Sequence, residues 1–224
     1  MITLIRLLQL ASPALPIGGY SYSQALEWMV EAGDVRDASG AHSWIGEMLD
    51  TVMAQGEAPV VARLCMLARP GEWHGFARWH AWFRASRETA ELLAETQQTG
   101  GALCKWMVEL ELADGAARGA MARCAPLTLP GAYALAARAL AIEPPDATAA
   151  YLWSWLENQV LAAVKAVPLG QASGQKMLLA LGARIPQVVD AAMVTPDEDV
   201  ASFAPGLALA SARHETQYTR LFRS

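Results

Sequence analysis

The chain is dominated by alanine and poor in the residues that favour strands. It holds 44 alanines among 224 residues, against 6 isoleucines, 13 valines and 10 threonines. Alanine loses no side-chain entropy in a helix, whereas β-branched side chains are restricted there and pack better on a pleated sheet. No convincing pair of strand-like segments interrupts this pattern. The imbalance therefore predicts an all-α protein.

Helix-stopping residues divide the chain into about ten segments. Pro13 ends the first helix, because the residue before a proline is pushed out of the helical region. Gly33 suits the position just after a helix, and Asp34 or Asp37 can cap the next one. Pro59 suits an early turn of the helix that follows. The expected helices cover residues 2–10, 23–32, 34 or 37 to 55, 59–69, 72–84, 86–112, 130–143, 146–167, 174–181, 186–194 and 198–213.

Two of these segments carry unusual residues. Gly100 and Gly101 form the weak point of helix 86–112, and Asp114-Gly115 is expected to close it. The helix at 72–84 is rich in aromatic residues that recur at three- and four-residue spacings and so share one face. That spacing indicates core or an oligomer contact, and the members of the set are Phe76, Trp79, Trp82 and Phe83.

The chain has no linker long or polar enough to divide it, and no repeat with a solenoid period. We therefore predict a single-domain helical bundle of about ten helices over residues 1–212. Residues 213–224 are expected to form a flexible C-terminal tail, since exposed ends of domains often fray.

Composition excludes several protein classes. Hydrophobic residues make up 54% and charged residues only 17%, against roughly 25% charged in a typical domain. Disorder is excluded by this apolar content, and a net charge of −5 argues against binding nucleic acid. No stretch approaches the ~18 uncharged apolar residues of a membrane span, and the N-terminus lacks signal-peptide features. We expect a cytoplasmic protein whose surplus apolar surface contacts partners, including a second copy of itself.

Signatures of catalysis and metal binding are missing. The sequence has neither GxGxxG nor GxxxxGK[ST], and the run from Gly170 to Lys176 has the wrong glycine spacing for a phosphate loop. The four histidines are not arranged with acidic or thiol side chains at metal-ligand spacing. We therefore predict no enzyme, no metal site and no cofactor of its own. The histidines are His42, His74, His80 and His214.

Three segments are more elaborate than a simple bundle requires. Residues 12–27 combine prolines, glycines and a run of hydroxyl side chains before a helix, which a tight turn with an N-cap would also explain. Residues 168–175 place glutamines and glycines at a helix corner. Residues 213–224 carry three arginines and one glutamate among aromatic and apolar residues, a composition typical of a docking peptide.

Together these segments resemble the urease accessory protein F (UreF) family, and the resemblance runs over the whole chain. It rests on Ser12-Pro-x-Leu-Pro-Ile-Gly-Gly-Tyr-Ser-Tyr-Ser, Ser86-Arg-Glu-Thr, Pro168-Leu-Gly-Gln-x-x-Gly-Gln and Tyr218-Thr-Arg-Leu-Phe-Arg-Ser, in that order. The chain departs from the family at Ala25, where a glycine is usual, and in the helix after Glu88, which is less basic.

The resemblance implies an all-helical, non-catalytic chaperone for nickel insertion into apo-urease. Members of the family are homodimers that bridge a D/H accessory protein and a GTPase, the G component, and are thought to regulate that GTPase. The tail is then expected to bind the D/H component through Tyr218, Arg220, Leu221, Phe222 and Arg223. The loop and the helix corner are expected to face the GTPase through Tyr20, Ser21, Tyr22, Ser23, Glu27, Lys165, Gln171 and Gln175.

Two other classes remain open at this point. A direct nickel carrier would bind nickel tightly by itself. The lack of clustered histidine and cysteine residues argues against this class. A small helical enzyme would use Glu27, His74 or His80, yet none of these has an acid–base partner at a useful spacing.

Overall fold

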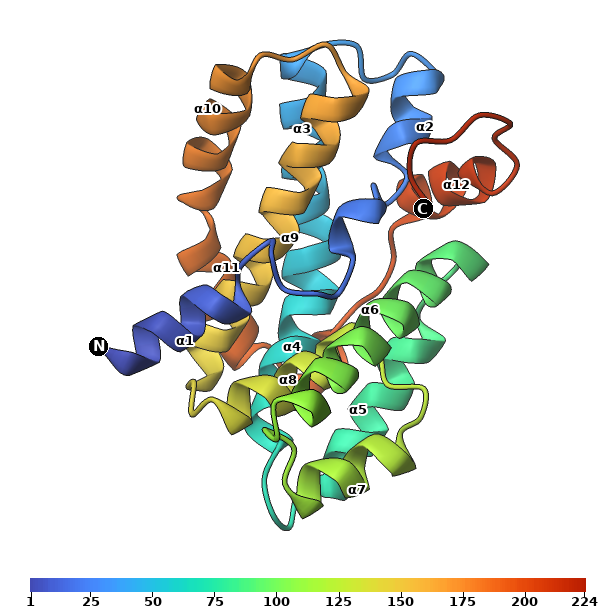
Figure 1. Cartoon of the computed structure of the whole chain (residues 1–224). Coiled ribbons are helices and arrows are strands. Elements are labelled where there is room, and N and C mark those ends of the chain that lie inside the picture. Colours follow the sequence, from blue (N-terminus) through green and yellow to red (C-terminus); the bar gives the residue numbers. More distant parts are fainter.

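The computed structural model describes residues 1–224 and consists of twelve α-helices with no strand, which confirms the all-α prediction (Figure 1). Short 3₁₀ turns, η1 (Gly19–Ser21) and η3 (Asp197–Asp199), and a π-helical segment, η2 (Leu49–Glu57), join some of them. The helices are α1 (Ile2–Leu10), α2 (Leu26–Glu31), α3 (Ala38–Met48), α4 (Ala58–Leu67), α5 (Trp73–Ala85), α6 (Ala90–Glu109), α7 (Gly115–Arg123), α8 (Leu129–Ala139), α9 (Pro144–Ala166), α10 (Gln171–Gly182), α11 (Ile185–Val194) and α12 (Pro205–His214).

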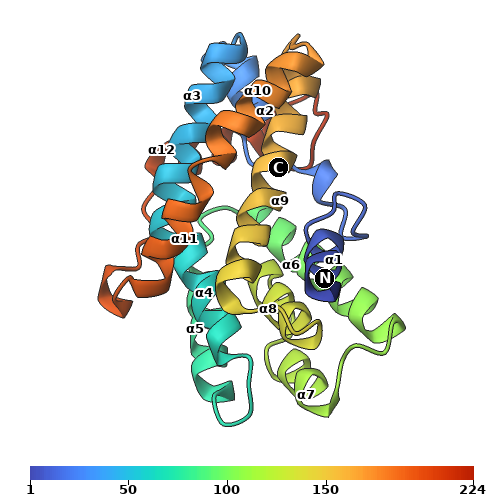
Figure 2. The same ribbon diagram turned by 90° about the vertical axis from the view of Figure 1, so that its left-hand side faces the viewer.

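The long helix α9 is the centre of the bundle. It packs against α4, α10 and α11, and also against α1, α2, α3 and α8. Figure 2 shows α9 beside the path of α3 and α4 along the long axis, with α5 to α8 gathered at one end. The buried face of α9 includes Leu152, Leu156 and Val160, each at most 2% exposed. These residues recur every four positions, so they form one apolar stripe that faces the core.

The helices α3 and α4 are one continuous helical path from Ala38 to Leu67, where two separate helices were expected. The π-helical segment between them lets the helical path continue through Pro59. This proline has no N–H to donate to the carbonyl of Gln55. The Gln55 carbonyl instead accepts a hydrogen bond from the Ala201 N–H at 3.0 Å. The proline thus ends no helix here. It frees an acceptor that holds the chain between α11 and α12.

Helix α7 was not predicted, because Asp114-Gly115 reads equally well as the end of one helix or the start of another. The Asp114 side chain accepts from the Ala117 N–H at 2.8 Å and so caps α7. It also pairs with Arg138 of α8 at 2.7 Å. The pair holds α7 against the rest of its layer.

The two glycines of α6, expected to weaken the helix, do not interrupt it, and they have different surroundings. The helix runs through both of them without a break. A Cβ on Gly100 would lie 2.3 Å from the backbone oxygen of Leu127, whereas a Cβ on Gly101 would meet nothing within 4 Å. Gly100 is therefore required for the close approach of the segment that leads into α8.

The aromatic face of α5 points into the hydrophobic core. Phe76, Trp79 and Phe83 are at most 6% exposed, and the Arg63 guanidinium lies 4.8 Å from the centre of the Trp79 ring. Three of the four predicted aromatic side chains therefore belong to the core, and the fourth, Trp82, is half-buried.

The C-terminal segment corrects the expectation of a flexible tail. Residue 213 still lies within α12, and the chain after His214 turns back onto the body beside α2 (Figure 1). Phe222 is only 6% exposed and Ser224 only 1%. Backbone hydrogen bonds to the N-terminal loop, described below, hold it there.

One stretch, residues 171–194, is long and apolar enough by composition to cross a membrane. It comprises two helices separated at Ala183 and Arg184, and they pack against α9 and α4. Core helices of soluble proteins pass the same test, so the stretch is weak evidence for a membrane span.

Candidate functional site: a C-terminal segment docked on the N-terminal loop

The structure brings two of the three elaborate segments, the N-terminal loop and the tail, into direct contact. The Arg223 N–H donates to the Ser21 carbonyl at 2.8 Å, and the Ser23 N–H donates to the Ser224 carbonyl at 2.7 Å. The Ser23 hydroxyl donates to the same carbonyl at 2.7 Å. We call the combined surface of residues 20–24 and 215–224 the loop–tail surface.

Glu27 is the central anchor of the loop–tail surface. Its carboxylate accepts from the Leu221 N–H at 2.6 Å and from the Phe222 N–H at 2.9 Å. The side chain is buried in the first turn of α2, so these two backbone donors replace the water that it has lost. Glu27 thus has a structural role, and it holds the tail rather than facing a partner.

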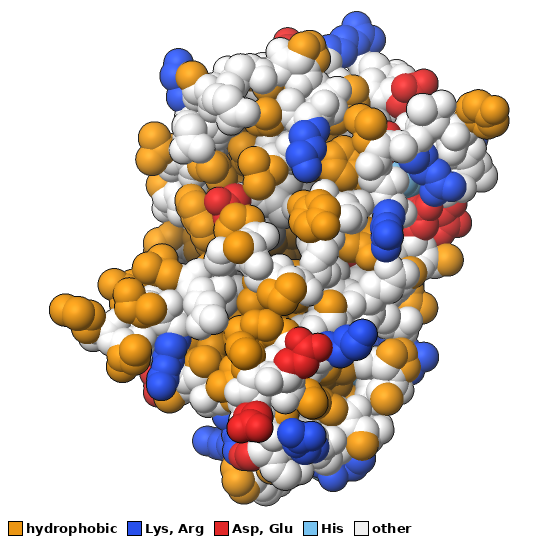
Figure 3. All heavy atoms as spheres, in the orientation of Figure 1, with side chains coloured by type: hydrophobic (Ala, Val, Ile, Leu, Met, Phe, Trp, Pro, Cys, Tyr) orange, Lys and Arg blue, Asp and Glu red, His pale blue; other side chains and the backbone are white.

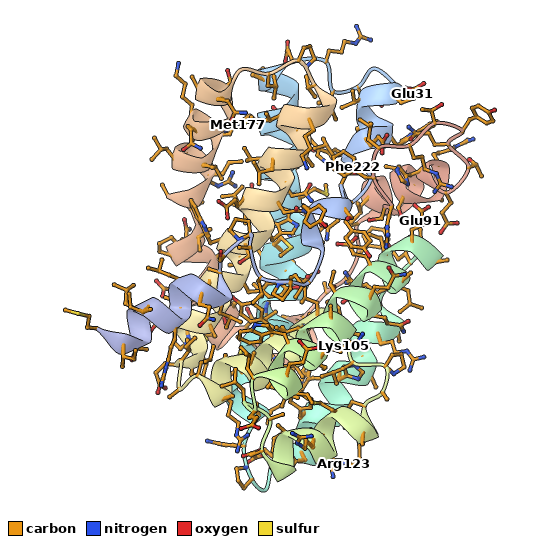
Figure 4. All side chains as sticks on the ribbon, in the orientation of Figure 1. Glu31, Glu91, Lys105, Arg123, Met177 and Phe222 are labelled. Carbon is orange, nitrogen blue, oxygen red and sulfur yellow. The ribbon has the colours of Figure 1, made fainter.

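A chain of polar side chains extends from Glu27 to the start of α6. His214 is fully buried, with its Nε2 atom 3.3 Å from Glu27 and its Nδ1 atom 2.6 Å from Glu91. Glu91 also pairs with Arg220 of the tail at 2.5 Å. In Figure 4, Glu91 lies beneath α12, while Phe222 lies beside α9. The tail is therefore held both at its backbone and at Arg220.

The loop itself is shaped by two consecutive residues in the left-handed region. Gln24 has a φ of 50° and Ala25 has a φ of 66°. A left-handed conformation costs an L-residue roughly 1–2 kcal/mol, which glycine avoids. The position where the family usually has glycine is thus one where the backbone favours it. The neighbouring Tyr22 is buried, and its hydroxyl donates to Gln98 of α6 at 2.8 Å.

Glu95 completes the contact between loop, tail and α6. Its two oxygens accept from the Gln24 amide at 2.8 Å and from the Ser224 hydroxyl at 2.6 Å. Burial raises the pKa of Glu95 to about 7, although both hydrogen bonds act in the opposite direction. The Gln24 amide is oriented by the Trp155 Nε1–H, which donates to its oxygen at 2.8 Å.

The sequence analysis missed the contribution of α6. Three of its polar side chains, Glu91, Glu95 and Gln98, recur at i, i+4 and i+7 and therefore lie on one helical face. That spacing, directly after the Ser86-Arg-Glu-Thr motif, is the signal that could have identified them.

The Ser86-Arg-Glu-Thr motif anchors α6 in the body. Arg87 pairs with the buried Glu57 at 3.2 Å, and the Tyr151 hydroxyl donates to the same carboxylate. Thr89 caps α6 by accepting from the Leu92 N–H at 3.3 Å. The motif therefore fixes the helix that carries Glu91 and Glu95.

The remaining predicted residues divide into exposed and buried positions. Tyr20 is 65% exposed, Leu221 72% and Tyr218 fully, while Phe222 is buried with the Lys165 ammonium 5.9 Å from its ring. Lys165 is also 5.9 Å from the Tyr20 ring. The helix corner stays apart, because the side chains of Gln171 and Gln175 are exposed and form no hydrogen bond with the loop or the tail. The loop–tail surface therefore presents Tyr20, Tyr218, Leu221 and Arg223 to solvent, and the exposed Lys165 of α9 lies beside it.

No group of three or more histidine, cysteine, aspartate or glutamate side chains is placed to hold a metal ion. His42 and His74 are exposed, whereas His80 is buried and accepts from the Thr128 N–H at 3.1 Å. His214 is engaged with carboxylates at both ring nitrogens. Each histidine therefore has a surface or structural position.

Comparison with known proteins identifies the family of this chain. The family model described as UreF matches residues 35–182. The urease accessory protein UreF of Azoarcus sp. (strain BH72) is 52% identical over 227 aligned residues, which cover 100% of this chain and 97% of that protein. The urease accessory protein UreF of Methylobacillus flagellatus is 46% identical, over 99% of this chain and 98% of that protein. The chain belongs to the UreF family of urease accessory proteins, which are maturation factors rather than enzymes.

Proposed function

We propose that this protein is a cytoplasmic chaperone and scaffold for nickel insertion into apo-urease. It acts without a cofactor of its own, bridges the D/H accessory protein and the GTPase G component, and regulates GTP-dependent assembly of the metal centre. The observation that carries the proposal is the loop–tail surface, which combines exposed aromatic, apolar and basic side chains on a protein of net charge −5. Aromatic residues and arginine are enriched in the contacts that dominate protein interfaces.

The D/H component is proposed to bind the outward face of the tail. Leu221 projects from a backbone that Glu27 already holds, so little ordering entropy is lost when a partner binds it, and Tyr218 is exposed three residues earlier. Phe222 supports this face from beneath, because it is buried against the body. Arg220 is partly committed to Glu91, which leaves Arg223 as the more available cation.

The GTPase is proposed to bind the exposed part of the loop, with Tyr20 and Lys165 as its main contacts. Ser21, Tyr22 and Ser23 contribute by holding this surface in shape, since their backbones or side chains bond the tail and α6. The two proposed contact zones share hydrogen bonds, so partners that use them bind side by side. Gln171 and Gln175 extend the GTPase zone only if that partner also reaches the exposed start of α10.

Co-purification with the two partners tests this function. The double variant Tyr218→Ala/Leu221→Ala removes exposed side chains and leaves the docked backbone intact, so we expect loss of the D/H component with unchanged helical circular dichroism. Phe203→Ala is the matched control, because Phe203 is 82% exposed and lies outside the loop–tail surface. Equal capture of the D/H component by the double variant and the control would contradict the proposal.

A second experiment addresses the GTPase. Tyr20→Ala should reduce capture of the GTPase, because it deletes the largest exposed side chain of the loop. Capture is compared with and without GTP and nickel, and with apo-urease present. Unchanged capture in every condition would show that the GTPase binds elsewhere on the protein.

Self-association is proposed to use α1. Ile2, Leu4, Ile5 and Leu8 are each more than half exposed on this helix, which projects from the body in Figure 1. A row of apolar side chains on one projecting helix is typical of an interface rather than of a monomer surface. We therefore place the homodimer contact there.

A further inference from the structure

A cavity of about 110 Å³ lies beneath the N-terminal loop. Its walls come from the end of α1, the loop, the last residue of η2 and helices α6, α8 and α9. Three lining residues, Pro13, Tyr20 and Leu161, are exposed at the protein surface and mark its mouth. Figure 3 shows the surface hollowed near the centre of the same face. The cavity is therefore reached from outside, next to the loop–tail surface.

The cavity has an excess of negative charge. Three glutamates line it, and only Glu57 has an ion-pair partner, Arg87 at 3.2 Å. Glu95 and Glu157 have no cation within ion-pair distance. Burial raises the pKa of both, to about 7 for Glu95. An isolated carboxylate in such surroundings takes up a proton or binds a cation.

The cavity also contains an unpartnered polar group. Tyr133 is 2% exposed and lines the cavity, and no hydrogen bond of normal geometry satisfies its hydroxyl, although the Ser154 hydroxyl on the same wall acts to lower its pKa. Buried polar atoms are nearly always paired, so an unpaired hydroxyl at a cavity wall is available to a ligand that enters the cavity. Together with the glutamate oxygens it forms a site rich in acceptors. A ligand that donates several hydrogen bonds and carries positive charge fits this chemistry.

We propose that this cavity is an anchor pocket for an arginine or lysine side chain of a partner protein. The proposal rests on the proposed function in one respect, namely that the protein acts by binding other proteins. A long basic side chain places its charged end among carboxylates while its aliphatic stem packs against apolar surface. Tyr20, Pro13 and Leu161 supply that surface at the mouth, and arginine in a closed pocket is a common interface hot spot.

The pocket is continuous with the loop–tail surface, which favours a protein partner over a free small cation. Tyr20 belongs to both, and Glu95 is held in place by Gln24 of the loop and Ser224 of the tail. A partner segment that covers Tyr20 thus passes directly over the mouth. Lys165, which also lies near Tyr20, is not part of the cavity lining.

Proton competition gives the site a pH dependence. With a pKa of about 7, Glu95 is largely protonated at pH 6 and largely ionised at pH 8. A cationic side chain binds the ionised form, so binding should be about tenfold weaker at pH 6 than at pH 8. The other titratable or charged groups around Glu95 are Glu57, Arg87, Tyr151, Tyr133, Glu157, Tyr22 and Arg223.

The first test uses the full chain and n-propylguanidinium chloride, with n-propylurea as the neutral probe of the same shape. Titration followed by calorimetry and by NMR should show binding of the guanidinium only. Glu95→Gln should weaken it at least tenfold and reduce its pH dependence to the part that Glu157 contributes, and Tyr133→Phe should weaken it several-fold. Glu109→Gln is the matched control, because Glu109 is exposed on the same helix α6. Absence of binding, or equal binding by the Glu95 and Glu109 variants, would overturn the proposal.

The second test measures capture of the D/H component and the GTPase by the same variants. Glu95→Gln should weaken capture of one partner at least tenfold, and n-propylguanidinium should compete with it. Guanidinium binding without any effect of Glu95→Gln on capture would assign the pocket to a free cation and overturn the partner assignment. If the unmodified chain captures neither partner, the proposed function fails, while the probe titration still decides whether the pocket binds cations.

Discussion

At the scale of single residues, Glu27 does the most to hold the loop–tail surface together. Its carboxylate accepts from two backbone N–H groups of the tail and lies 3.3 Å from His214. Hydrogen bonds to a buried charged group contribute about 1.5–3 kcal/mol each. A neutral amide offers one oxygen and presents a competing N–H to the same donors. Loss of this carboxylate therefore weakens both of its hydrogen bonds to the tail at once.

Glu27→Gln should release the tail while the helical body stays folded. Trypsin cleavage after Arg220 and Arg223 measures that release, and we expect it to accelerate at least tenfold. Glu31→Gln on the exposed end of α2 is the control, and in Figure 4 Glu31 lies well away from Phe222. Equal cleavage rates for the two variants would mean that the tail is held by other contacts.

His80 is a second residue whose charge state is set by the fold. Its Nε2 atom accepts from the buried Thr128 N–H at 3.1 Å, and burial, with Arg84 nearby, lowers its pKa to about 4. The unfolded chain, with a histidine pKa near 6.5, therefore binds more protons between pH 4 and 6.5. The free energy of unfolding contributed by His80 is complete above pH 6.5 and is lost as the pH falls towards 4.

We expect about 3 kcal/mol of stability to be lost through His80 over that range. Urea unfolding of the unmodified chain and of His80→Gln, measured from pH 4 to 7, isolates the effect as a difference between the two. His74→Gln, at an exposed position, should follow the unmodified chain. The difference is needed because Glu95, whose pKa is raised, has the opposite slope and loses stability as the pH rises from about 4.5 to 7.

At the scale of elements, the contact between α6 and the segment that leads into α8 requires a residue without a side chain, Gly100. Gly100→Ala would place a Cβ 2.3 Å from the Leu127 oxygen, so the two elements must separate. We expect a loss of about 2–3 kcal/mol or more in urea unfolding. Gly101→Ala is the matched control and should stabilise by about 0.5–1 kcal/mol, since it meets nothing and improves helix propensity. Similar effects of the two substitutions would contradict this account.

At the scale of the whole molecule, the exposed apolar face of α1 is the feature that the monomer leaves unexplained. The proposed homodimer contact on α1 predicts that Leu4→Ser/Leu8→Ser sediments as a monomer at micromolar concentration, whereas the unmodified chain sediments as a dimer, because the two side chains are 56% and 58% exposed. Leu209→Ser provides the control, as Leu209 is 68% exposed on α12. A dimer that persists in the double variant would place the self-contact on another face.

Local features of the fold were the ones that the sequence predicted best. The alanine excess and the residues that cap or break helices predicted most helices. The exceptions were ambiguous signals, at Asp114, which ends or begins a helix, and at Pro59, which a π turn accommodates. The order of four short motifs along the chain was enough to indicate the UreF family.

Sequence by itself thus determined the all-α class, the family and the segments in which function was to be sought, because these depend on residue type and on neighbours a few positions apart. Only the tertiary structure decided that the tail is docked and that Glu27 and Phe222 hold it rather than meet a partner. It alone brought Glu57, Glu95 and Tyr133 around one cavity. The bond between Ser23 and Ser224 joins residues 201 positions apart, and no local propensity specifies a contact over that separation.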